Sequence, residues 1–168
     1  VIKNDLEKLI TSLKKHKTDK DYFLEVRAQD PNKQSDVAVA SRFIFLNRTC
    51  FNGMYRVNSK GGFNVPFGKY TNPLICDEDN LRKVSKALQN IDIKHQDYKE
   101  VLKKAKKGGF IYFDPPYYPV SKTASFTSYT AEAFLEKEQT GLRDTLVELN
   151  KRGCFVMLSN SDTPFINK

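Results

Sequence analysis

The feature that most constrains the fold is an apolar run that ends abruptly in a proline turn. Residues 109–119 read GFIYFDPPYYP, so apolar and aromatic residues give way to an aspartate, two prolines and two tyrosines. The run predicts a buried strand, and the prolines end it because each fixes φ and lacks a backbone N–H. Ligands bind at the carboxyl ends of strands in an open α/β sheet, so Asp114 lies where a reactive site is expected.

The segments around this run alternate between strand and helix patterns. The sequence predicts strands over 91–95, 110–113 and 154–161 and helices over 98–105 and 133–151. Strands that alternate with helices are typical of a parallel sheet with crossover helices. We therefore expect residues 91–168 to form part of a doubly wound α/β domain.

Residues 1–90 differ because helical patterns dominate them. Apolar residues at helical spacing predict helices over 6–16, 22–28, 37–48 and 78–88. Two β-prone pieces, MYRV and FNVPF, flank the polar connection NSKGG, a pattern typical of a β-hairpin over 54–68. Pro66 indicates that the second arm is an edge strand. This part is expected to be a mainly helical module that carries a hairpin.

Charge and composition narrow the function classes. Lys and Arg outnumber Asp and Glu by 28 to 20, and the net charge of +8 favours a polyanionic partner, although a merely soluble basic protein explains it equally well. The sequence contains neither an apolar run long enough for a membrane span nor a signal-peptide pattern at its start, so a cytoplasmic protein is expected. Cys50, Cys76 and Cys154 are not spaced with the two histidines as zinc ligands, so we expect reduced thiols in the core and no metal site.

The proline turn supplies the groups needed to hold an aromatic amine. Asp114 offers a carboxylate, Pro115 a rigid carbonyl and Tyr117 a flat ring. The amino group of a nucleobase is a poor nucleophile because its lone pair is delocalised, and two acceptors on its hydrogens return electron density to nitrogen. The alternative is a plain stiff turn with an exposed aspartate and packed tyrosines.

The turn and the hairpin together resemble one enzyme family. DPPY after an apolar strand is similar to the catalytic motif of amino-methyltransferases, and the stretches RFIFLNRTCFNGMYRVNSKGGFNVPFGKY and FDPPYYPVSKTASFTSYT resemble the Dam family (D12 class) of DNA adenine-N6 methyltransferases. The resemblance implies a partial Rossmann-like methyltransferase sheet over 91–168 and a target-recognition module over 1–90. It also implies S-adenosylmethionine as cofactor, double-stranded DNA as partner, and methylation of a flipped adenine in GATC, as in restriction-modification.

The resemblance assigns the catalytic and cofactor residues one by one. The matches to the catalytic motif are Asp114, Pro115, Pro116 and Tyr117, and the matches to cofactor contacts are Asp97, Tyr98 and Asp114. Without the resemblance, Asp97 is explained more simply as a helix cap. We therefore expect the reaction at the turn and the adenine end of the cofactor near Asp97.

The hairpin matches the family's target-recognition element. Arg56 corresponds to the arginine that reads guanine, and a guanidinium suits this role because it can bond both O6 and N7 in the major groove. Lys60, Lys69 and Arg48 are expected at phosphates, which position the protein without specifying sequence. The full set expected to contact DNA is Phe51, Asn52, Met54, Arg56, Asn58, Lys60, Asn64, Pro66, Tyr70, Phe126 and Tyr129.

Two parts of the family pattern have no counterpart in the sequence. One is the N-terminal Phe-x-Gly-x-Gly cofactor loop with its following acidic residue, and the other is the set of strands beyond LSNS. We therefore expect an internal fragment that is weakly active or inactive alone. The alternatives are a non-catalytic DNA-binding fragment and a cytosine-N4 methyltransferase, although the latter enzymes usually carry serine where Asp114 stands.

Overall fold

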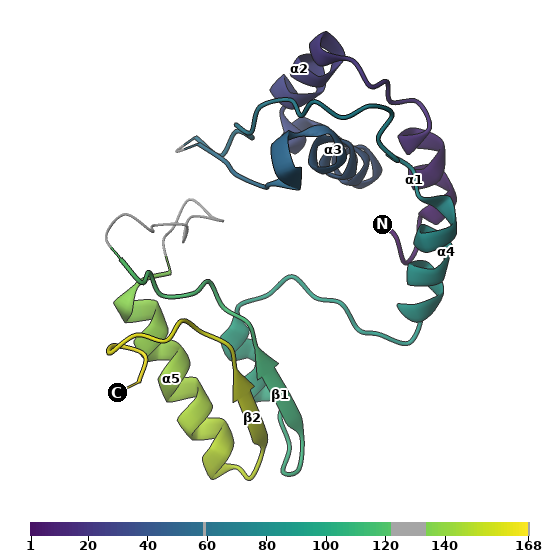
Figure 1. The fold of residues 1–168 in the computed structure, drawn as a ribbon. Coiled ribbons are helices and arrows are strands. Elements are labelled where there is room, and N and C mark those ends of the chain that lie inside the picture. The colour runs from purple at the N-terminus through teal and green to yellow at the C-terminus, as the bar shows by residue number, and fades with distance from the viewer. Residues whose placement is uncertain (59, 122–133, 168) are drawn as a thin grey trace. The chain divides into compact units, whose positions relative to one another are not determined.

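The computed structural model describes residues 1–58, 60–121 and 134–167 (Figure 1). The chain divides into two compact units, Val1–Ile93 and Lys94–Lys168. In chain order the elements are α1 (Leu6–Leu13), α2 (Lys20–Ala28), the 3₁₀ helix η1 (Pro31–Lys33), α3 (Asp36–Thr49), the 3₁₀ helix η2 (Phe51–Gly53), α4 (Glu78–Ala87), the 3₁₀ helix η3 (Tyr98–Lys103), β1 (Phe110–Phe113), α5 (Glu136–Lys151) and β2 (Phe155–Leu158). Within the described residues, each helix is too short or too polar to cross a lipid bilayer.

Side-chain caps begin three helices of the first unit. Asp19, Ser35 and Asp77 each accept a hydrogen bond from the backbone N–H three residues later, at the starts of α2, α3 and α4. Such caps satisfy backbone donors that have no partner within the helix. The four helices predicted for this half are confirmed, but the first ends at Leu13 rather than at His16.

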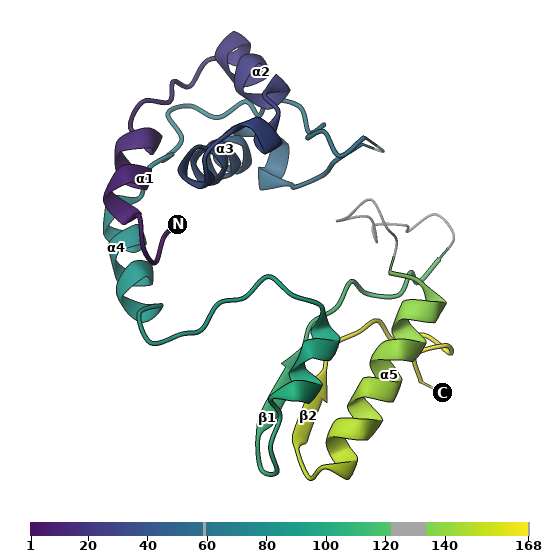
Figure 2. The same cartoon turned by 180° about the vertical axis from the view of Figure 1, so that it is seen from behind.

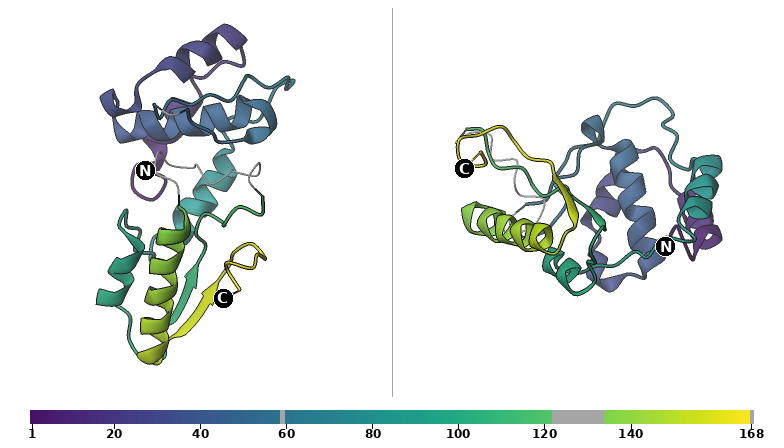
Figure 3. Two further views of the ribbon diagram at one scale, coloured as in Figure 1. Left: turned by 90° about the vertical axis from the view of Figure 1, so that its left-hand side faces the viewer. Right: turned by 90° about the horizontal axis from the view of Figure 1, so that it is seen from below.

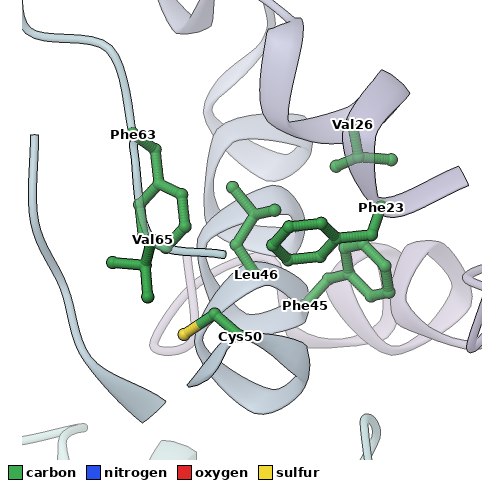
Figure 4. Close-up of a cluster of buried hydrophobic side chains, with 7 residues drawn as sticks. All are labelled: Phe23, Val26, Phe45, Leu46, Cys50, Phe63 and Val65. Carbon is green, nitrogen blue, oxygen red and sulfur yellow. The ribbon is translucent and has the colours of Figure 1, made fainter. Parts of the chain in front are cut away.

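The first unit is built around α3, whose buried side face packs against α2 and the extended segment that follows η2 (Figure 4). Burial of a large apolar side chain contributes about 1.5–3 kcal/mol. The core therefore anchors the segment expected to carry the recognition residues. The buried members of this cluster are Phe23, Val26, Phe45, Leu46, Cys50, Phe63 and Val65.

The segment predicted as a hairpin forms isolated antiparallel bridges instead of regular strands. The bridges pair Val57 with Phe63 and Cys50 with Phe67. A ladder between the two arms cannot continue through Pro66, because proline has no backbone N–H to donate. The regular hairpin is therefore not confirmed, although the chain does reverse direction there.

The second unit contains a small parallel sheet covered on one face. β1 and β2 pair in register from Phe110 with Phe155 to Phe113 with Leu158. α5 and η3 lie against the same face of these strands (Figures 2 and 3). This mixture of helix with a parallel sheet confirms the α/β class, while the Rossmann-like extent of the sheet stays a prediction. The buried side chains between the layers are Phe113, Leu142, Leu149 and Cys154.

The other face of this sheet is also apolar. Its side chains are Phe110, Tyr112, Phe155 and Met157, which are 67%, 51%, 67% and 55% exposed. Parallel sheets are normally covered on both faces, and their strands are then apolar on both sides. The composition of β1 and β2 therefore favours the predicted doubly wound architecture.

The strand predicted over 91–95 is wrong. The residues between α4 and η3 have no regular structure, and Ile91 and Ile93 are 50% and 62% exposed. Their alternation with polar residues imitates a strand, but within the described residues β1 pairs with β2 alone.

The helix predicted over 98–105 is the 3₁₀ helix η3. All three cysteines are free, as expected, but Cys76 is only half-buried.

Candidate active site and nucleic-acid interface

Asp114 directly follows β1, at the carboxyl end of the strand. Phe113, the last strand residue, is buried under α5 and fixes the point at which the chain leaves the sheet. Asp114 is exposed, and the ring of Tyr117 is 49% exposed. Pro115 and Pro116 between them are half-buried. The structure thus places an accessible carboxylate and an accessible aromatic ring on one short, stiff turn.

Side chains from elsewhere in the unit hold the backbone of this turn. The carbonyl of Pro116 accepts a hydrogen bond from Gln139 Nε2 at 2.9 Å. The N–H of Tyr118 donates to Asn160 Oδ1 at 2.9 Å, and its carbonyl accepts from Ser161 Oγ at 2.5 Å. The backbone on both sides of the intervening tyrosine is therefore fixed.

Two oxygen acceptors of the turn remain open. Among the described residues, nothing donates a hydrogen bond to the Asp114 carboxylate or to the Pro115 carbonyl. Polar groups without a protein partner are usually satisfied by water or a ligand. The turn therefore presents two acceptors that the described residues leave open, close in sequence to the exposed ring of Tyr117.

The second tyrosine of the motif has a different role. The ring of Tyr118 stacks on Phe165 with centroids 4.7 Å apart, and its hydroxyl donates to Glu136 at 2.9 Å. This hydrogen bond, with burial and the negative charge of Glu136, raises the pKa of the Tyr118 hydroxyl. The ring of Tyr118 is thus packed within the protein, which leaves Tyr117 as the ring available to a base.

An open depression of about 550 Å³ beside the turn is lined by Tyr118, Pro119, Ser121, Leu135, Glu136 and Lys137.

The residues expected at the cofactor are partly engaged within the protein. Asp97 begins η3 by accepting from the N–H of Lys99 at 2.8 Å, as the helix-cap interpretation predicts. The ring of Tyr98 packs edge-on to Phe113 and Phe134 at 6.5 and 6.3 Å, and burial raises the pKa of its hydroxyl. Asp97 is exposed and keeps one carboxylate oxygen for a ligand, whereas Tyr98 belongs largely to the core. The described residues contain no His, Cys, Asp and Glu group suited to a metal ion.

In the first unit, the turn after α3 exposes two of the predicted DNA contacts. Phe51 and Met54 are 49% and 38% exposed, and Asn52 adopts a left-handed backbone with φ of 52°. Asparagine tolerates this conformation better than most residues. The N–H of Phe51 donates to the Pro66 carbonyl at 2.9 Å, which holds the turn against the second extended arm.

Arg56 is held by Asn64 across the two extended arms. Its Nε donates to Asn64 Oδ1 at 2.8 Å, and its Nη2 donates to the Asn64 carbonyl at 3.4 Å. Both bonds use the side edge of the guanidinium. Because the far edge, formed by Nη1 and Nη2, has no other partner in the described part of the chain, it can meet an acceptor pair on a ligand.

The remaining predicted DNA contacts fall into different settings. The side chain of Asn58 accepts from the N–H groups of Lys60 and Gly62 at 3.0 Å each, so it shapes the loop. Lys60, Pro66 and Tyr70 are exposed. Phe126 and Tyr129 lie outside the described residues.

Three residues at the turn were not predicted from the sequence: Gln139, Asn160 and Ser161. Asn160 carried a usable signal, since it follows the end of β2 as Asp114 follows the end of β1. The carboxyl ends of parallel strands lie at one edge of a sheet, so polar residues after each strand belong to one site. Gln139 gave no such signal, because a glutamine in an amphipathic helix is normally solvated.

The open carboxylate, the proline-locked carbonyl and the accessible tyrosine at the end of a parallel strand match the arrangement expected for an amino-methyltransferase. The family model described as D12 class N6 adenine-specific DNA methyltransferase matches residues 1–168, and the chain belongs to this family.

Three curated relatives show how far the similarity extends. The chain is 44% identical over 171 residues to the type II methyltransferase M1.LlaDCHI of Lactococcus lactis subsp. cremoris, covering 97% of this chain and 60% of that protein. It is 44% identical over 173 residues to the type II methyltransferase M.MjaIII of Methanocaldococcus jannaschii, covering 96% and 60%. It is 36% identical over 137 residues to the DNA adenine methylase of Escherichia coli strain K12, covering 82% and 47%. The chain thus spans between about half and three-fifths of these relatives.

Proposed function

We propose that this chain carries two parts of a DNA methyltransferase that methylates the N6 amine of adenine. One is the reaction turn, residues 114–118, and the other is the recognition surface, formed by the predicted DNA contacts between residues 51 and 70. The donor is S-adenosylmethionine and the target is adenine within GATC. The observation that carries the proposal is the pair of open acceptors, Asp114 and the Pro115 carbonyl, beside the exposed ring of Tyr117 at the end of β1. Membership in the adenine-specific family supports adenine over cytosine as the target base.

The turn acts on the amine by holding its two hydrogens. Asp114 accepts one and the Pro115 carbonyl the other, which directs the nitrogen lone pair toward the electrophile. S-adenosylmethionine bound beside the turn would supply a methyl group on a positively charged sulfur, while Asp114 and the Pro115 carbonyl would hold the amine that takes up this group. Correct placement of the nitrogen at near-attack distance contributes about 7–11 kcal/mol to lowering the barrier.

Tyr117 holds the base after it leaves the duplex. The adenine amine is paired inside double-stranded DNA, so the base must be extruded before it can react. Stacking on an aromatic ring contributes about 1–3 kcal/mol per base and offsets part of the unpairing cost. The ring is a candidate for this role because, among the residues that the structure describes, Tyr118 and not Tyr117 is stacked on another ring, and Tyr117 is 49% exposed.

The residues expected to hold S-adenosylmethionine fit it in part. The free oxygen of Asp97 suits a hydroxyl or amine donor, and Asp114 offers a second carboxylate. The Tyr98 ring packs edge-on to Phe113 and Phe134, so it is engaged with the core beside Asp97 in the sequence. In this proposal, Asp97 makes the polar contact to the cofactor while Tyr98 orients η3.

Residues 1–90 serve as the recognition module and 91–168 as part of the catalytic domain. The free edge of the Arg56 guanidinium is the feature that favours base reading, because guanine presents O6 and N7 as an acceptor pair in the major groove. Phe51 and Asn52 sit on an exposed turn next to it in sequence, where they can enter the duplex. The DNA contacts proposed in addition are Met54, Lys60, Pro66 and Tyr70.

The test uses a chimaera in which residues 1–168 replace the matching segment of the L. lactis relative. Tyr117→Ala should strongly reduce methyl transfer to a GATC duplex and leave salt-sensitive binding in place, whereas Tyr117→Phe should keep most of the activity. Arg56→Ala should instead reduce discrimination between GATC and other duplexes by about 1–3 kcal/mol. Binding without any methyl transfer by the unsubstituted chimaera would overturn the catalytic proposal and favour a DNA-binding fragment.

A further inference from the structure

Gln139 is a polar side chain in the interior of the second unit. It lies on α5 and is 5% exposed. A buried amide is unfavourable unless both of its ends are hydrogen-bonded. Gln139 meets this requirement, since Nε2 donates to the Pro116 carbonyl and Oε1 accepts from Asn160 Nδ2, each at 2.9 Å. Both partners belong to the edge of the sheet where the reaction turn lies.

Asn160 extends the network to the other side of the turn. Its Oδ1 accepts from the N–H of Tyr118 and from the N–H of Ser161, both at 2.9 Å. Ser161 in turn donates to the Tyr118 carbonyl. Two side chains, one from α5 and one from the segment after β2, thus hold the turn on both sides of Tyr117.

The orientation of both amides is determined by the backbone groups at the ends of the network. The Pro116 carbonyl can only accept, so Gln139 must present its NH₂ group there. The N–H of Tyr118 can only donate, so Asn160 must present its oxygen there. The bond between the two amides then has one possible direction, and the network has no equivalent flipped arrangement.

The turn needs such outside support because of its own composition. Pro115 and Pro116 have no N–H, so they cannot hold the turn through backbone donors. Apolar side chains could fill the same volume, but they would not fix the direction of a carbonyl. The bonds to Pro116 and Tyr118 also leave the adjacent Pro115 carbonyl open.

We infer that Gln139 and Asn160 are positioning residues that set the Pro115 carbonyl and the Tyr117 ring for methyl transfer. The inference rests on the proposed function, because it assigns these residues to the same reaction. They do not touch the reacting atoms. They act through the backbone of the turn, on which the direction of the carbonyl and the place of the ring depend.

The first experiment replaces the donor of Gln139 without changing its shape. In the chimaera, Gln139→Glu leaves an ionised carboxylate that cannot donate to the Pro116 carbonyl. At pH 8 we expect kcat to fall about 10- to 100-fold, since misplacement by about 1 Å costs rate on that scale. The KM for DNA should change little because the recognition surface is untouched.

A pH series separates positioning from general damage to the fold. When the carboxyl group introduced by Gln139→Glu is protonated, it regains an O–H donor, so the ratio of variant kcat to parent kcat should rise as the pH falls from 8 to 5.5. Gln139→Ala should show no such recovery. Gln89→Glu is the matched control, because Gln89 also donates to backbone carbonyls, those of Lys3 and Ser85 in the first unit. Its ratio should stay near one at every pH.

Hydrogen exchange provides a readout that does not require activity. In the 168-residue chain, Asn160→Ala removes the acceptor of the Tyr118 amide and should speed its exchange about tenfold, the loss of one net hydrogen bond. Gln139→Ala removes the partner that holds Asn160 and should speed exchange of the same amide to a smaller extent. The Phe155 amide, which donates to the Gly109 carbonyl in the sheet, reports whether the unit stays folded. Exchange at Phe155 should be unchanged.

The outcomes distinguish the inference from the proposed function. If the unsubstituted chimaera transfers no methyl group to adenine, the proposed function fails, and the exchange rate of Tyr118 alone decides whether the pair holds the turn. If transfer occurs but Gln139→Glu behaves like Gln89→Glu, the inference is overturned while the function stands. Unchanged exchange at Tyr118 in both alanine variants overturns it as well.

Discussion

Asn64→Ala should weaken sequence discrimination even if Asn64 makes no contact with DNA. In the free protein, Asn64 accepts from Arg56 Nε at 2.8 Å and so holds the guanidinium in one orientation. Without that bond, the exposed arginine samples many rotamers and must be ordered when it binds guanine. We therefore predict that Asn64 preorganises Arg56, a role that does not require the direct DNA contact expected from the sequence.

The size of the effect follows from the cost of ordering one long side chain. Immobilising such a side chain on binding costs about 0.5–1.5 kcal/mol, which corresponds to roughly a 2- to 12-fold loss of specific affinity. Arg56→Ala removes the base contact itself and should cost about 1–3 kcal/mol, or roughly 5- to 150-fold. Asn64→Ala should have no further effect in the Arg56→Ala background, because there is no guanidinium left to hold.

Fluorescence anisotropy with two duplexes at one salt concentration measures this double-mutant cycle. One duplex carries GATC and the other carries 7-deazaguanine in place of the guanine, which removes the N7 acceptor. Asn32→Ala, at an exposed asparagine of η1, is the matched control and should leave the ratio of the two affinities unchanged. The reasoning is refuted if the losses from Asn64→Ala and Arg56→Ala add, or if Asn64→Ala weakens both duplexes equally.

Three further predictions concern stability and catalysis. Burial lowers the pKa of His16, so the unfolded chain takes up a proton at a higher pH than the folded chain. The free energy of unfolding should therefore fall as the pH drops below about 6.5. Urea denaturation at pH 7.5 and 5.5 should show this decrease, and the decrease should be smaller in His16→Gln. Gly68→Ala should destabilise the first unit by about 1–3 kcal/mol, since a Cβ there would lie 2.9 Å from the Cys50 carbonyl oxygen and 2.4 Å from the Tyr70 ring. An unchanged midpoint of chemical denaturation would contradict this prediction and show that the backbone relaxes around the added methyl group. Tyr117→Leu should keep the turn folded by circular dichroism but lower kcat in the chimaera, through the loss of about 1–3 kcal/mol of stacking; an unchanged kcat would contradict the stacking role.

The helices of the first unit could be predicted from the sequence because their signals are local. A cap such as Ser35 and the apolar spacing after it lie within a few residues of each other, so neither depends on the rest of the fold. The end of the first helix was missed because His16 is fixed by distant groups. Its ring bonds Tyr22 and Ser41 at 2.9 and 3.0 Å and stacks on Phe45, which the local pattern does not reveal.

Strand predictions succeeded where a partner exists and failed where none is described. The apolar run at β1 and the apolar run at β2 pair with each other, but residues 91–95, where apolar and polar residues alternate, have no neighbouring strand in the described part of the chain. Periodicity indicates which face a strand would bury, not whether another strand lies beside it. The same limit applies to the hairpin, where Pro66 stops the ladder that the flanking sequence suggests.

The reaction turn itself could be predicted, but its support could not. Asp114 and Tyr117 stand out because an aspartate, two prolines and an aromatic residue rarely end a buried strand without a reason. Gln139 and Asn160 belong to no motif that the sequence reveals, and their partners are backbone groups 23 and 42 residues away. Only the folded arrangement shows that they meet at the turn.

The most direct test of the central claim follows labelled methyl groups from S-adenosylmethionine into duplexes that differ only at GATC, with the chimaera and its Asp114→Ala variant. We predict label on adenine N6 in the GATC duplex and a loss of at least about 100-fold in rate with Asp114→Ala, because one of the two acceptors on the amine is removed. Transfer that proceeds equally well without the Asp114 carboxylate would contradict the account.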